Sequence, residues 1–341
     1  MSRLIFAASL ALAVQFGPAR AHAQTSTALL KAELIEVRKI ADDAPHNAFT
    51  DLIYWRDQFV CAFRQGRGHV STDGRIAILT SVDGDQWKLA DTLSLPDLDL
   101  RDASLSKTPD GRLMLIGGVA PRKADNESSA TGSFVAFSEN GRDWTEPQII
   151  VEPGRWLWRV TWHDGKAYGV SYATPDNHPV ASLLVSDDGV KFTELVPKLL
   201  AEGWPTEAVI RFAADGTAYC LQRRDGSAPA NSAYLGVSQP PYEQWQWNDL
   251  HEFFGGPNLL QLPDGQWIAA GRIVREGKPT TYVALLDVAA KTLTPLLSLP
   301  SGGDTSYPGL VYREGVLWVS YYSSHEEKTN IYLAKVRLTP Q

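Results

Sequence analysis

The sequence is poor in the residues and motifs that hold metals or nucleotides. It has two cysteines in 341 residues, neither in a CxxC pair, and its seven histidines include no pair at zinc-ligand spacing. No glycine-rich phosphate loop follows a strand and opens a helix, and no GxSxG elbow occurs. We therefore expect no metal and no cofactor, and we set aside nucleotide-dependent and serine-hydrolase chemistry.

Excess positive charge and long apolar runs are also lacking. The 32 basic and 39 acidic residues give a net charge of −7, which disfavours nucleic acids and anionic membranes as partners. The apolar run LIFAASLALAV near the N-terminus is too short to span a bilayer, and Ala21-His22-Ala23 follows it as a small-x-small cleavage pattern. These features predict a signal peptide over residues 1–23 and a secreted or periplasmic protein with no membrane insertion.

Helix signals are hard to find, whereas tight turns recur at a regular spacing. The turns fall at Arg56-Asp57, Asp110-Gly111, Asp164-Gly165, Asp215-Gly216, Asp264-Gly265 and Glu314-Gly315, at intervals of 54, 54, 51, 49 and 50 residues. A period near fifty, with a strand on each side of the turn, is typical of a propeller with one four-stranded sheet per repeat. We predict an all-β, six-bladed β-propeller that forms a single domain over residues 24–341.

Each repeat supplies its own strands, except that the chain ends before the fourth strand of the last repeat. The innermost strands are predicted at residues 51–55, 103–107, 158–162, 207–212, 258–262 and 309–313. The segment ELIEVRKI (33–40) is left over at the mature N-terminus. It can supply the missing strand and close the ring, which removes exposed sheet edges.

The two cysteines occupy equivalent places in this repeat. Cys61 and Cys220 each lie five residues after the first residue of their turn, in blades one and four. In a six-bladed ring these blades are on opposite sides, whereas a disulfide needs Cα atoms within roughly 7 Å. Although an exported protein with two cysteines would ordinarily suggest one disulfide, we predict two buried free thiols.

A second repeated pattern lies between the third and fourth strands of three blades. It reads SVDGDQW (81–87), SENGRDW (138–144) and SDDGVKF (186–192). The Ser and Asp or Asn side chains can accept hydrogen bonds from the turn backbone, while Gly accepts the left-handed conformation. In register with the blades, these segments resemble the Asp boxes (BNR repeats) of the sialidase (neuraminidase) superfamily. The resemblance covers nearly the whole mature chain, and it implies a sialidase-like propeller whose boxes lie away from the site.

The repeat also predicts which side chains surround the central depression. In a propeller the first strand of each blade starts, and the second ends, on the same face. The first-strand starts carry Asp51, Arg101, Asp102, Arg159, Glu207, Asn258, Asp304 and Tyr307, and the second-strand ends carry Arg64, Gly118, Tyr172, Arg223, Arg272 and Tyr322. Arginines gathered round one pocket of an acidic protein suit a carboxylate, a sulfate or sugar hydroxyls. Alternatively, each arginine pairs with a neighbouring acid and ties blades together.

The candidate substrate-binding residues are therefore the arginines of these positions together with one histidine of the first-blade loop: Arg64, His69, Arg101, Arg159, Arg223 and Arg272. A lone loop histidine is also compatible with a plain surface position. Of the arginines, Arg64, Arg223 and Arg272 share one equivalent position and are expected to converge on the axis.

Glu207 and Tyr307 form the most informative pair. A tyrosine is a poor nucleophile near neutral pH because its pKa is about 10, so it needs an adjacent carboxylate to take its proton. The resemblance to sialidases implies that Tyr307 is the nucleophile and Glu207 its base; the alternative is a packing aromatic in an inner strand. The general acid is expected to be Asp102 or Asp73, with His69 as a third possibility.

One departure from the sialidase pattern bears on the substrate. Sialidases begin the first inner strand with an arginine, whereas this chain reads NAFTDLIYW and has none there. We therefore expect an exported glycosidase that acts on another glycan or oligosaccharide, such as one ending in a uronic or other acidic sugar. We also expect the protein to be a monomer. The alternatives are a non-catalytic glycan-binding propeller and a polysaccharide lyase that uses Tyr307 as base on uronates.

Overall fold

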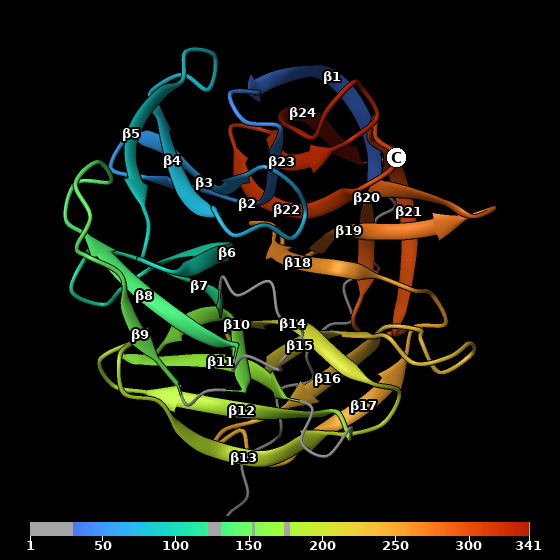
Figure 1. The fold of residues 1–341 in the computed structure, drawn as a ribbon. Coiled ribbons are helices and arrows are strands. Elements are labelled where there is room, and N and C mark those ends of the chain that lie inside the picture. Colours follow the sequence, from blue (N-terminus) through green and yellow to red (C-terminus); the bar gives the residue numbers. More distant parts are fainter. Residues whose placement is uncertain (1–29, 122–130, 152–153, 174–177, 341) are drawn as a thin grey trace, which may run out of the picture.

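The computed structural model describes residues 30–121, 131–151, 154–173 and 178–340, and in these ranges the regular elements are all strands. Twenty-four strands form six four-stranded antiparallel sheets, which surround a common axis (Figure 1). No helix of the described part is long and apolar enough to cross a membrane. The prediction of an all-β, six-bladed propeller is confirmed. The predicted signal peptide (1–23) lies outside the described residues.

Each blade runs outward from the axis in chain order. Blades one to three contain β2 (His46–Trp55), β3 (Gln58–Gly66), β4 (Arg75–Ser81) and β5 (Lys88–Leu93); β6 (Leu98–Lys107), β7 (Leu113–Pro121), β8 (Gly132–Ser138) and β9 (Gln148–Ile150); β10 (Arg155–His163), β11 (Lys166–Ala173), β12 (Val180–Ser186) and β13 (Thr193–Leu200). Blades four and five contain β14 (Pro205–Phe212), β15 (Ala218–Arg224), β16 (Tyr234–Ser238) and β17 (Gln246–Asp249); β18 (Gly255–Gln261), β19 (Trp267–Arg275), β20 (Lys278–Asp287) and β21 (Thr292–Ser298).

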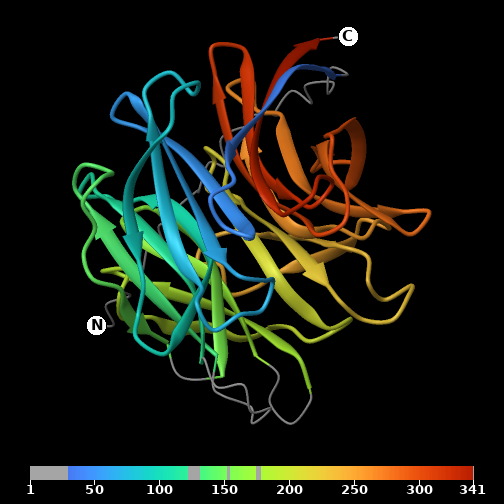
Figure 2. The ribbon, with the colours of Figure 1, turned by 45° about the horizontal axis from the view of Figure 1, so that its top comes forward.

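Blade six joins the two ends of the described chain. It contains β22 (Thr305–Arg313), β23 (Val316–Ser323) and β24 (Asn330–Pro340), and its outermost strand is β1 (Leu30–Ala41). β1 pairs with β24 in antiparallel register from Leu30 opposite Pro340 to Ala41 opposite Ile331. Figures 1 and 2 show this N-terminal strand, in blue, beside the red C-terminal strands. The predicted closure of the ring by the N-terminal strand is confirmed.

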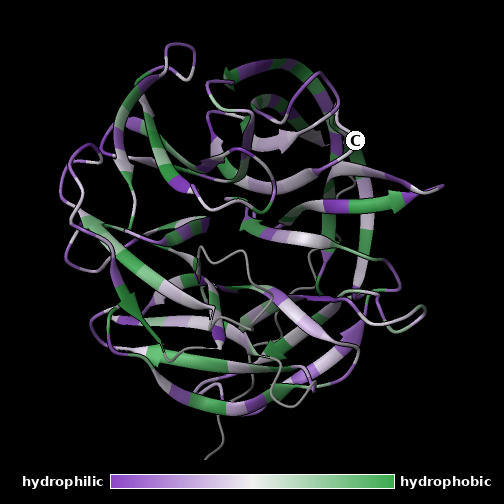
Figure 3. Cartoon of the chain, in the orientation of Figure 1, coloured by the Kyte–Doolittle hydropathy of each residue, from purple (hydrophilic) through white to green (hydrophobic). Residues whose placement is uncertain are grey.

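The hydrophobic core is divided among the interfaces between neighbouring blades. Successive side chains of a strand point to opposite faces of its sheet, so each inner strand serves two interfaces. In β14, for example, Ile210 packs toward blade three with Cys220, while its neighbour Val209 packs toward blade five with Trp267. Figure 3 shows the resulting hydrophobic bands along the strands, with hydrophilic residues concentrated in loops and edges. This sixfold division holds the blades around the axis.

All six inner strands have a β-bulge near their axial start. Each inner strand has two residues between consecutive paired positions where its partner has one: residues 49–50, 102–103, 158–159, 206–207, 256–257 and 307–308. A bulge redirects side chains and often lies beside a functional site. Four of these positions have a positive φ, namely Phe49, Asp102, Gly256 and Tyr307. The repeated bulge therefore points side chains of the inner strands into the central depression.

The three Ser-x-Asp/Asn-Gly segments form closed turns at the opposite end of the blades. In the first, Ser81 Oγ accepts a hydrogen bond from Gly84 N at 2.8 Å, and Asp83 Oδ1 accepts from Asp85 N at 2.8 Å. The segments at 138–144 and 186–192 repeat both bonds. Ser81 lies opposite Phe59, at the blade end away from Arg64. These turns therefore stabilise the far face and leave the axial bulges to form a site.

Candidate functional site

Bulge residues from several blades line a depression at the axis. Phe49, Asp102, Trp158 and Tyr307 are among its lining residues. The rings of Phe49 and Tyr307 meet edge to face with centroids 5.1 Å apart, and Trp158 lies 5.6 Å from Tyr307. The site therefore combines an aromatic floor with buried acids.

Tyr307 and Glu207 are directly hydrogen-bonded, although they lie in blades six and four. The Tyr307 hydroxyl donates to Glu207 Oε1, while Glu207 Oε2 accepts from Arg223 Nη1 at 2.7 Å and from Gly256 N at 2.9 Å. Glu207 is only 4% exposed. Three donors from three blades thus fix the carboxylate, and the predicted proximity of Glu207, Tyr307 and Arg223 is present in the structure.

The electrostatics of this pair suit a neutral tyrosine beside an ionised acid. Burial alone would raise the pKa of Glu207, but Arg223, the Tyr307 hydroxyl and Arg272 together hold it below its ordinary value. Burial raises the pKa of Tyr307 well above its ordinary value, and the nearby Glu207 charge adds to this effect. Glu207 is therefore ready to accept a proton, and Tyr307 holds one until the hydroxyl reacts.

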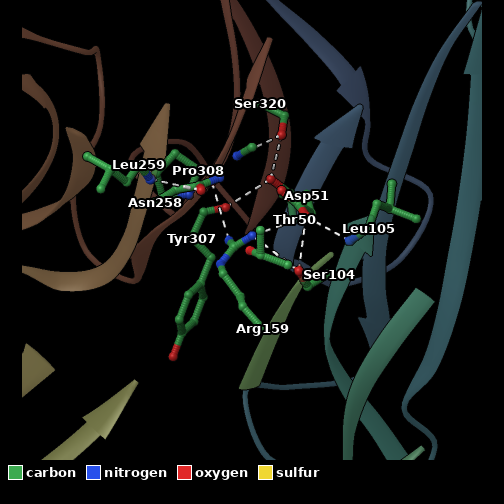
Figure 4. Close-up of polar contacts among 12 residues, drawn as sticks. Thr50, Asp51, Ser104, Leu105, Arg159, Asn258, Leu259, Tyr307, Pro308 and Ser320 are labelled. Carbon is green, nitrogen blue, oxygen red and sulfur yellow. Dashed lines mark hydrogen bonds and ion pairs between the residues drawn. The ribbon is translucent and has the colours of Figure 1, made fainter. Parts of the chain in front are cut away.

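A polar network behind Tyr307 fixes its backbone in an unusual conformation. Tyr307 has φ +43°, which an ordinary side chain adopts only when its surroundings enforce it. Thr50 Oγ1 donates to the carbonyl of Tyr307 at 3.0 Å, and Asn258 Nδ2 donates to that of Pro308 at 2.9 Å. Figure 4 shows the Tyr307 ring pointing away from this network. The network therefore positions the hydroxyl from behind.

Gly256 completes the support of the pair. Its φ is +59°, and an added Cβ would lie 2.7 Å from both Ser306 Oγ and the Tyr307 ring. The glycine lets the β18 backbone approach closely enough for its N–H to reach Glu207. A side chain here would push against Tyr307.

The two aspartates predicted as general acids have different surroundings. Asp102 is buried, and its Oδ1 has no hydrogen-bond partner among the described residues. Burial raises the pKa of Asp102 to about 6, although Arg101 opposes the shift. Asp73 lies in the exposed loop after β3, where its carboxylate accepts from Arg67 N at 3.2 Å and pairs with the Arg67 guanidinium. Of the two, Asp102 is the one placed at the depression.

The predicted arginines divide into two groups. Arg223 contacts Glu207, and Arg272 is close enough to lower the pKa of that carboxylate. Arg101 lies over the Phe49 ring at 4.9 Å, and its Nε is buried with no partner in the described part of the chain. These three positive charges surround the Tyr307–Glu207 pair and the Phe49 ring.

Arg64 differs from the expectation that it faces a ligand, whereas Arg159 lines the depression but already has an acid as partner. Arg64 is fully buried, and its guanidinium binds Asp99 together with the Gly68 carbonyl and Ser71 Oγ. Arg159 is 4% exposed and pairs with Asp51 at 3.0 Å beneath Tyr307. Both arginines tie blades together, which is the alternative that the sequence left open. The physical reason is that each has an acid of another blade within reach: Asp99 of the adjacent blade two for Arg64, and Asp51 of blade one for Arg159 in blade three.

His69 lies at the rim and contacts the same aromatic floor. Its ring meets Phe49 edge to face at 5.2 Å, and its Nδ1 lies 2.6 Å from Asp304 Oδ2. His46 Nε2 lies 3.0 Å from the same oxygen. The three side chains place donor atoms within 4.8 Å of one another, which makes them the group of the described residues with a geometry that a metal ion could use.

Comparison with solved structures supports the fold, whereas comparison with known sequences finds no relative. No family profile and no curated protein sequence matches this chain. Among solved structures, a protein of unknown function from Dyadobacter fermentans is similar with a TM-score of 0.77 and 19% identity, over 90% of this chain and 99% of that one. The Hadza microbial sialidase Hz136 is similar with a TM-score of 0.66 and 14% identity, over 86% of this chain. Trypanosoma rangeli sialidase in complex with sialic acid has a TM-score of 0.66 and 10% identity, over 90% of this chain.

The chain has the propeller fold of these solved structures. The chain spans 66% and 58% of the length of the two sialidases, so the likeness concerns the propeller and not their whole chains. At these identities the likeness places the fold alone, and the activity has to be argued from the site.

Sequence reasoning missed three residues of this candidate site: His46, Phe49 and Trp158. Phe49 is the aromatic centre of the floor, with the rings of His69, Tyr307 and Tyr322 all within 5.3 Å of it. A signal for it was available in the turn spacing. Phe49 precedes its turn by seven residues, as Tyr307 does, and Asp102 and Glu207 precede theirs by eight. Aligning the blades on their bulges, and not on their strand starts, would have included it.

Proposed function

We propose that this protein is an exported glycoside hydrolase that removes a terminal acidic sugar from a glycan. The single observation that carries the proposal is the hydrogen bond from the Tyr307 hydroxyl to the buried Glu207 carboxylate at the axis. A tyrosine paired with an ionised acid is an activated nucleophile. Export rests on the predicted signal peptide over residues 1–23.

The reaction follows from the charges of the pair. Tyr307 attacks the anomeric carbon while Glu207 accepts its proton, so the attacking group is neutral in the resting site. A neutral nucleophile approaches an anomeric carbon that bears a carboxylate more easily than a carboxylate nucleophile does, because two negative charges repel. A glycosyl–tyrosine intermediate is then hydrolysed by water, with retention of configuration.

The positive charges support an acidic sugar as substrate. Arg101, Arg223 and Arg272 belong to the site of a protein whose net charge is −7. The buried Nε of Arg101 gains a partner if a ligand oxygen reaches it. The T. rangeli enzyme binds sialic acid in its complex. Here the first inner strand reads NAFTDLIYW and has no arginine at its start, which favours an acidic sugar held differently, such as a uronic acid.

Departure of the leaving group requires a proton donor at the depression. Asp73 is ionised by its surroundings: partial burial is outweighed by hydrogen bonds from Ser71 and the Arg67 backbone, which lower its pKa. Asp102, with a pKa of about 6, and His69 are the donors that remain.

The test is hydrolysis of a panel of methylumbelliferyl glycosides of N-acetylneuraminic acid, glucuronic acid, galacturonic acid and neutral sugars. We expect wild-type protein to cleave an acidic member, and Tyr307→Phe and Glu207→Gln each to reduce kcat/KM by about 10³-fold or more, which is about 4 kcal/mol of transition-state stabilisation. Tyr312→Phe, in the same strand but away from the axis, is the matched control and should retain activity.

Three outcomes contradict the proposal. Full activity in both variants would show that the assigned roles are wrong. Binding of acidic glycans with no turnover would indicate a glycan-binding propeller, and an unsaturated uronate product would indicate a lyase.

A further inference from the structure

Two histidines converge on one carboxylate oxygen beside the depression. His46 opens β2, His69 lies in the loop between β3 and β4, and Asp304 precedes β22, so three separate segments meet. Asp304 Oδ2 lies 2.6 Å from His69 Nδ1 and 3.0 Å from His46 Nε2, while its Oδ1 accepts from the Tyr322 hydroxyl at 2.9 Å. Burial of Asp304 is outweighed by these hydrogen bonds, which lower its pKa, so the carboxylate is ionised.

The two histidines differ in what they can do. Because Oδ2 is an acceptor, His69 donates from Nδ1, and its second nitrogen, Nε2, is left for other partners. The His69 side chain is 52% exposed, whereas that of His46 is 8% exposed and its other nitrogen is enclosed by protein. His69 is therefore the member of the group that can exchange a proton with a ligand, and His46 helps to hold Asp304.

The position of His69 relative to the floor suits a proton donor to the leaving group. In a retaining glycosidase the nucleophile and the acid flank the scissile bond from different sides. Asp102 is buried and lines the floor of the depression together with Tyr307. His69 meets the Phe49 ring edge to face and is half-exposed to solvent. A leaving group departs toward solvent, where a half-exposed donor can reach it.

We infer that His69 is the acid/base of the reaction and that Asp304 is its positioning residue; this inference rests on the proposed glycosidase function. In the first step His69 Nε2–H gives its proton to the glycosidic oxygen as the bond to the anomeric carbon breaks. Tyr307 Oη forms the new bond to that carbon, and its proton goes to Glu207. In the second step neutral His69 takes a proton from water, whose oxygen displaces Tyr307, and Glu207 returns the proton to the tyrosine.

The experiment compares two leaving groups on the acidic sugar that the panel identifies. Dinitrophenolate departs from its glycoside without being protonated, whereas the methoxy group of a methyl glycoside needs an acid to protonate it as it leaves. We expect His69→Ala to reduce kcat on the methyl glycoside by about 10²- to 10⁴-fold and on the dinitrophenyl glycoside by less than about tenfold. His251→Ala, at a side chain that is 87% exposed, is the matched control and should leave both rates unchanged.

Further variants separate a chemical role from a structural one. His69→Asn retains a donor in the place of Nδ1 but has no Nε2, so it should fold as wild type does and show the same leaving-group dependence. Asp304→Asn should lower kcat on the methyl glycoside with little change in KM, and it should have a much smaller effect on the dinitrophenyl glycoside.

Each remaining outcome counts against the inference in an identifiable way. Equal losses on both glycosides, or selective loss of the methyl glycoside in Asp102→Asn alone, would overturn the role of His69 and leave the glycosidase intact. Loss of activity with a chelator, restored by zinc, would show that the three side chains bind a metal and would overturn it too. A wild-type protein that cleaves neither glycoside nor any panel member overturns the proposed function, and the role of His69 with it.

Discussion

Blades one and four place an arginine at the same repeat position and use it in opposite ways. Arg64 lies two residues before the end of β3 and Arg223 one residue before the end of β15, each eight residues after the start of its turn. Arg223 reaches the axis, where it binds Glu207 beneath the candidate substrate. Arg64 is fully buried and binds Asp99 of blade two through both Nε and Nη2, at 2.8 and 3.0 Å.

The difference comes from the neighbours and not from the position. In blade one the loop after β3 folds back over Arg64, so that the Gly68 carbonyl and Ser71 accept the remaining hydrogen bonds of its guanidinium. That loop carries His69. Blade four has instead Asp225 two residues later, which binds Arg223 Nε at 2.8 Å and leaves the guanidinium beside Glu207. Arg64 thus supports the loop at the rim of the site, and Arg223 lies beside Glu207 at its floor.

The largest expected effect is on stability and concerns Arg64. Arg64→Met leaves Asp99 buried without its partner, which should lower the free energy of unfolding by about 3–5 kcal/mol. Urea unfolding measures this change, with Arg112→Met as control because the exposed pair of Arg112 with Asp110 should contribute less than about 1 kcal/mol. A loss for Arg64→Met no larger than that of the control would show that the contrast between the two arginines is wrong.

Arg223→Met should have its main effect on activity, and that effect should grow at acidic pH. Arg223 is the largest of the influences that hold the pKa of Glu207 below its ordinary value, so its removal raises that pKa. Glu207 accepts a proton only when ionised, and the acidic limb of kcat/KM should therefore move to higher pH. We expect about a tenfold loss at neutral pH, or about 1.4 kcal/mol. A pH profile with an unmoved acidic limb would separate Arg223 from the Tyr307–Glu207 pair.

The contrast also marks how far the sequence could predict this molecule. Turn chemistry is local, so the spacing of Asp-Gly and related turns was sufficient for six blades and for the closing strand. It also placed Glu207, Arg223 and Tyr307 at one depression, because equivalent positions in a propeller converge on the axis. The partner of Arg64 is 35 residues away in the next blade, and no local pattern links the two. Whether an arginine faces a ligand or an acid is therefore decided by tertiary contacts.

The bulges set a second limit on what the sequence could predict. Sequence alternation assigns inward and outward faces along a regular strand, but an extra residue shifts the alternation from that point onward. Phe49 was overlooked for this reason, since it precedes the predicted strand at 51–55 and lies within the bulge of β2. The same shift brings Asp102 and Tyr307 into the depression, where the repeat had also placed them as first-strand starts.

The smallest expected effect comes from the cysteines, which occupy another equivalent pair of positions in the same two blades. Cys61 and Cys220 are buried free thiols that pack in separate clusters, one between blades six and one and the other between blades three and four. Burial raises the pKa of both thiols, which makes them unreactive. A reducing agent should therefore change the melting temperature by less than about 1 °C, since there is no cross-link whose loss would typically cost about 2–5 kcal/mol. Ellman's reagent should react with neither thiol in the native protein and with two thiols after denaturation without reductant.

Unlike the arginines, the cysteines serve the same purpose in both blades. A buried thiol that packs as an apolar side chain needs no specific partner, so an equivalent position is enough to define its role.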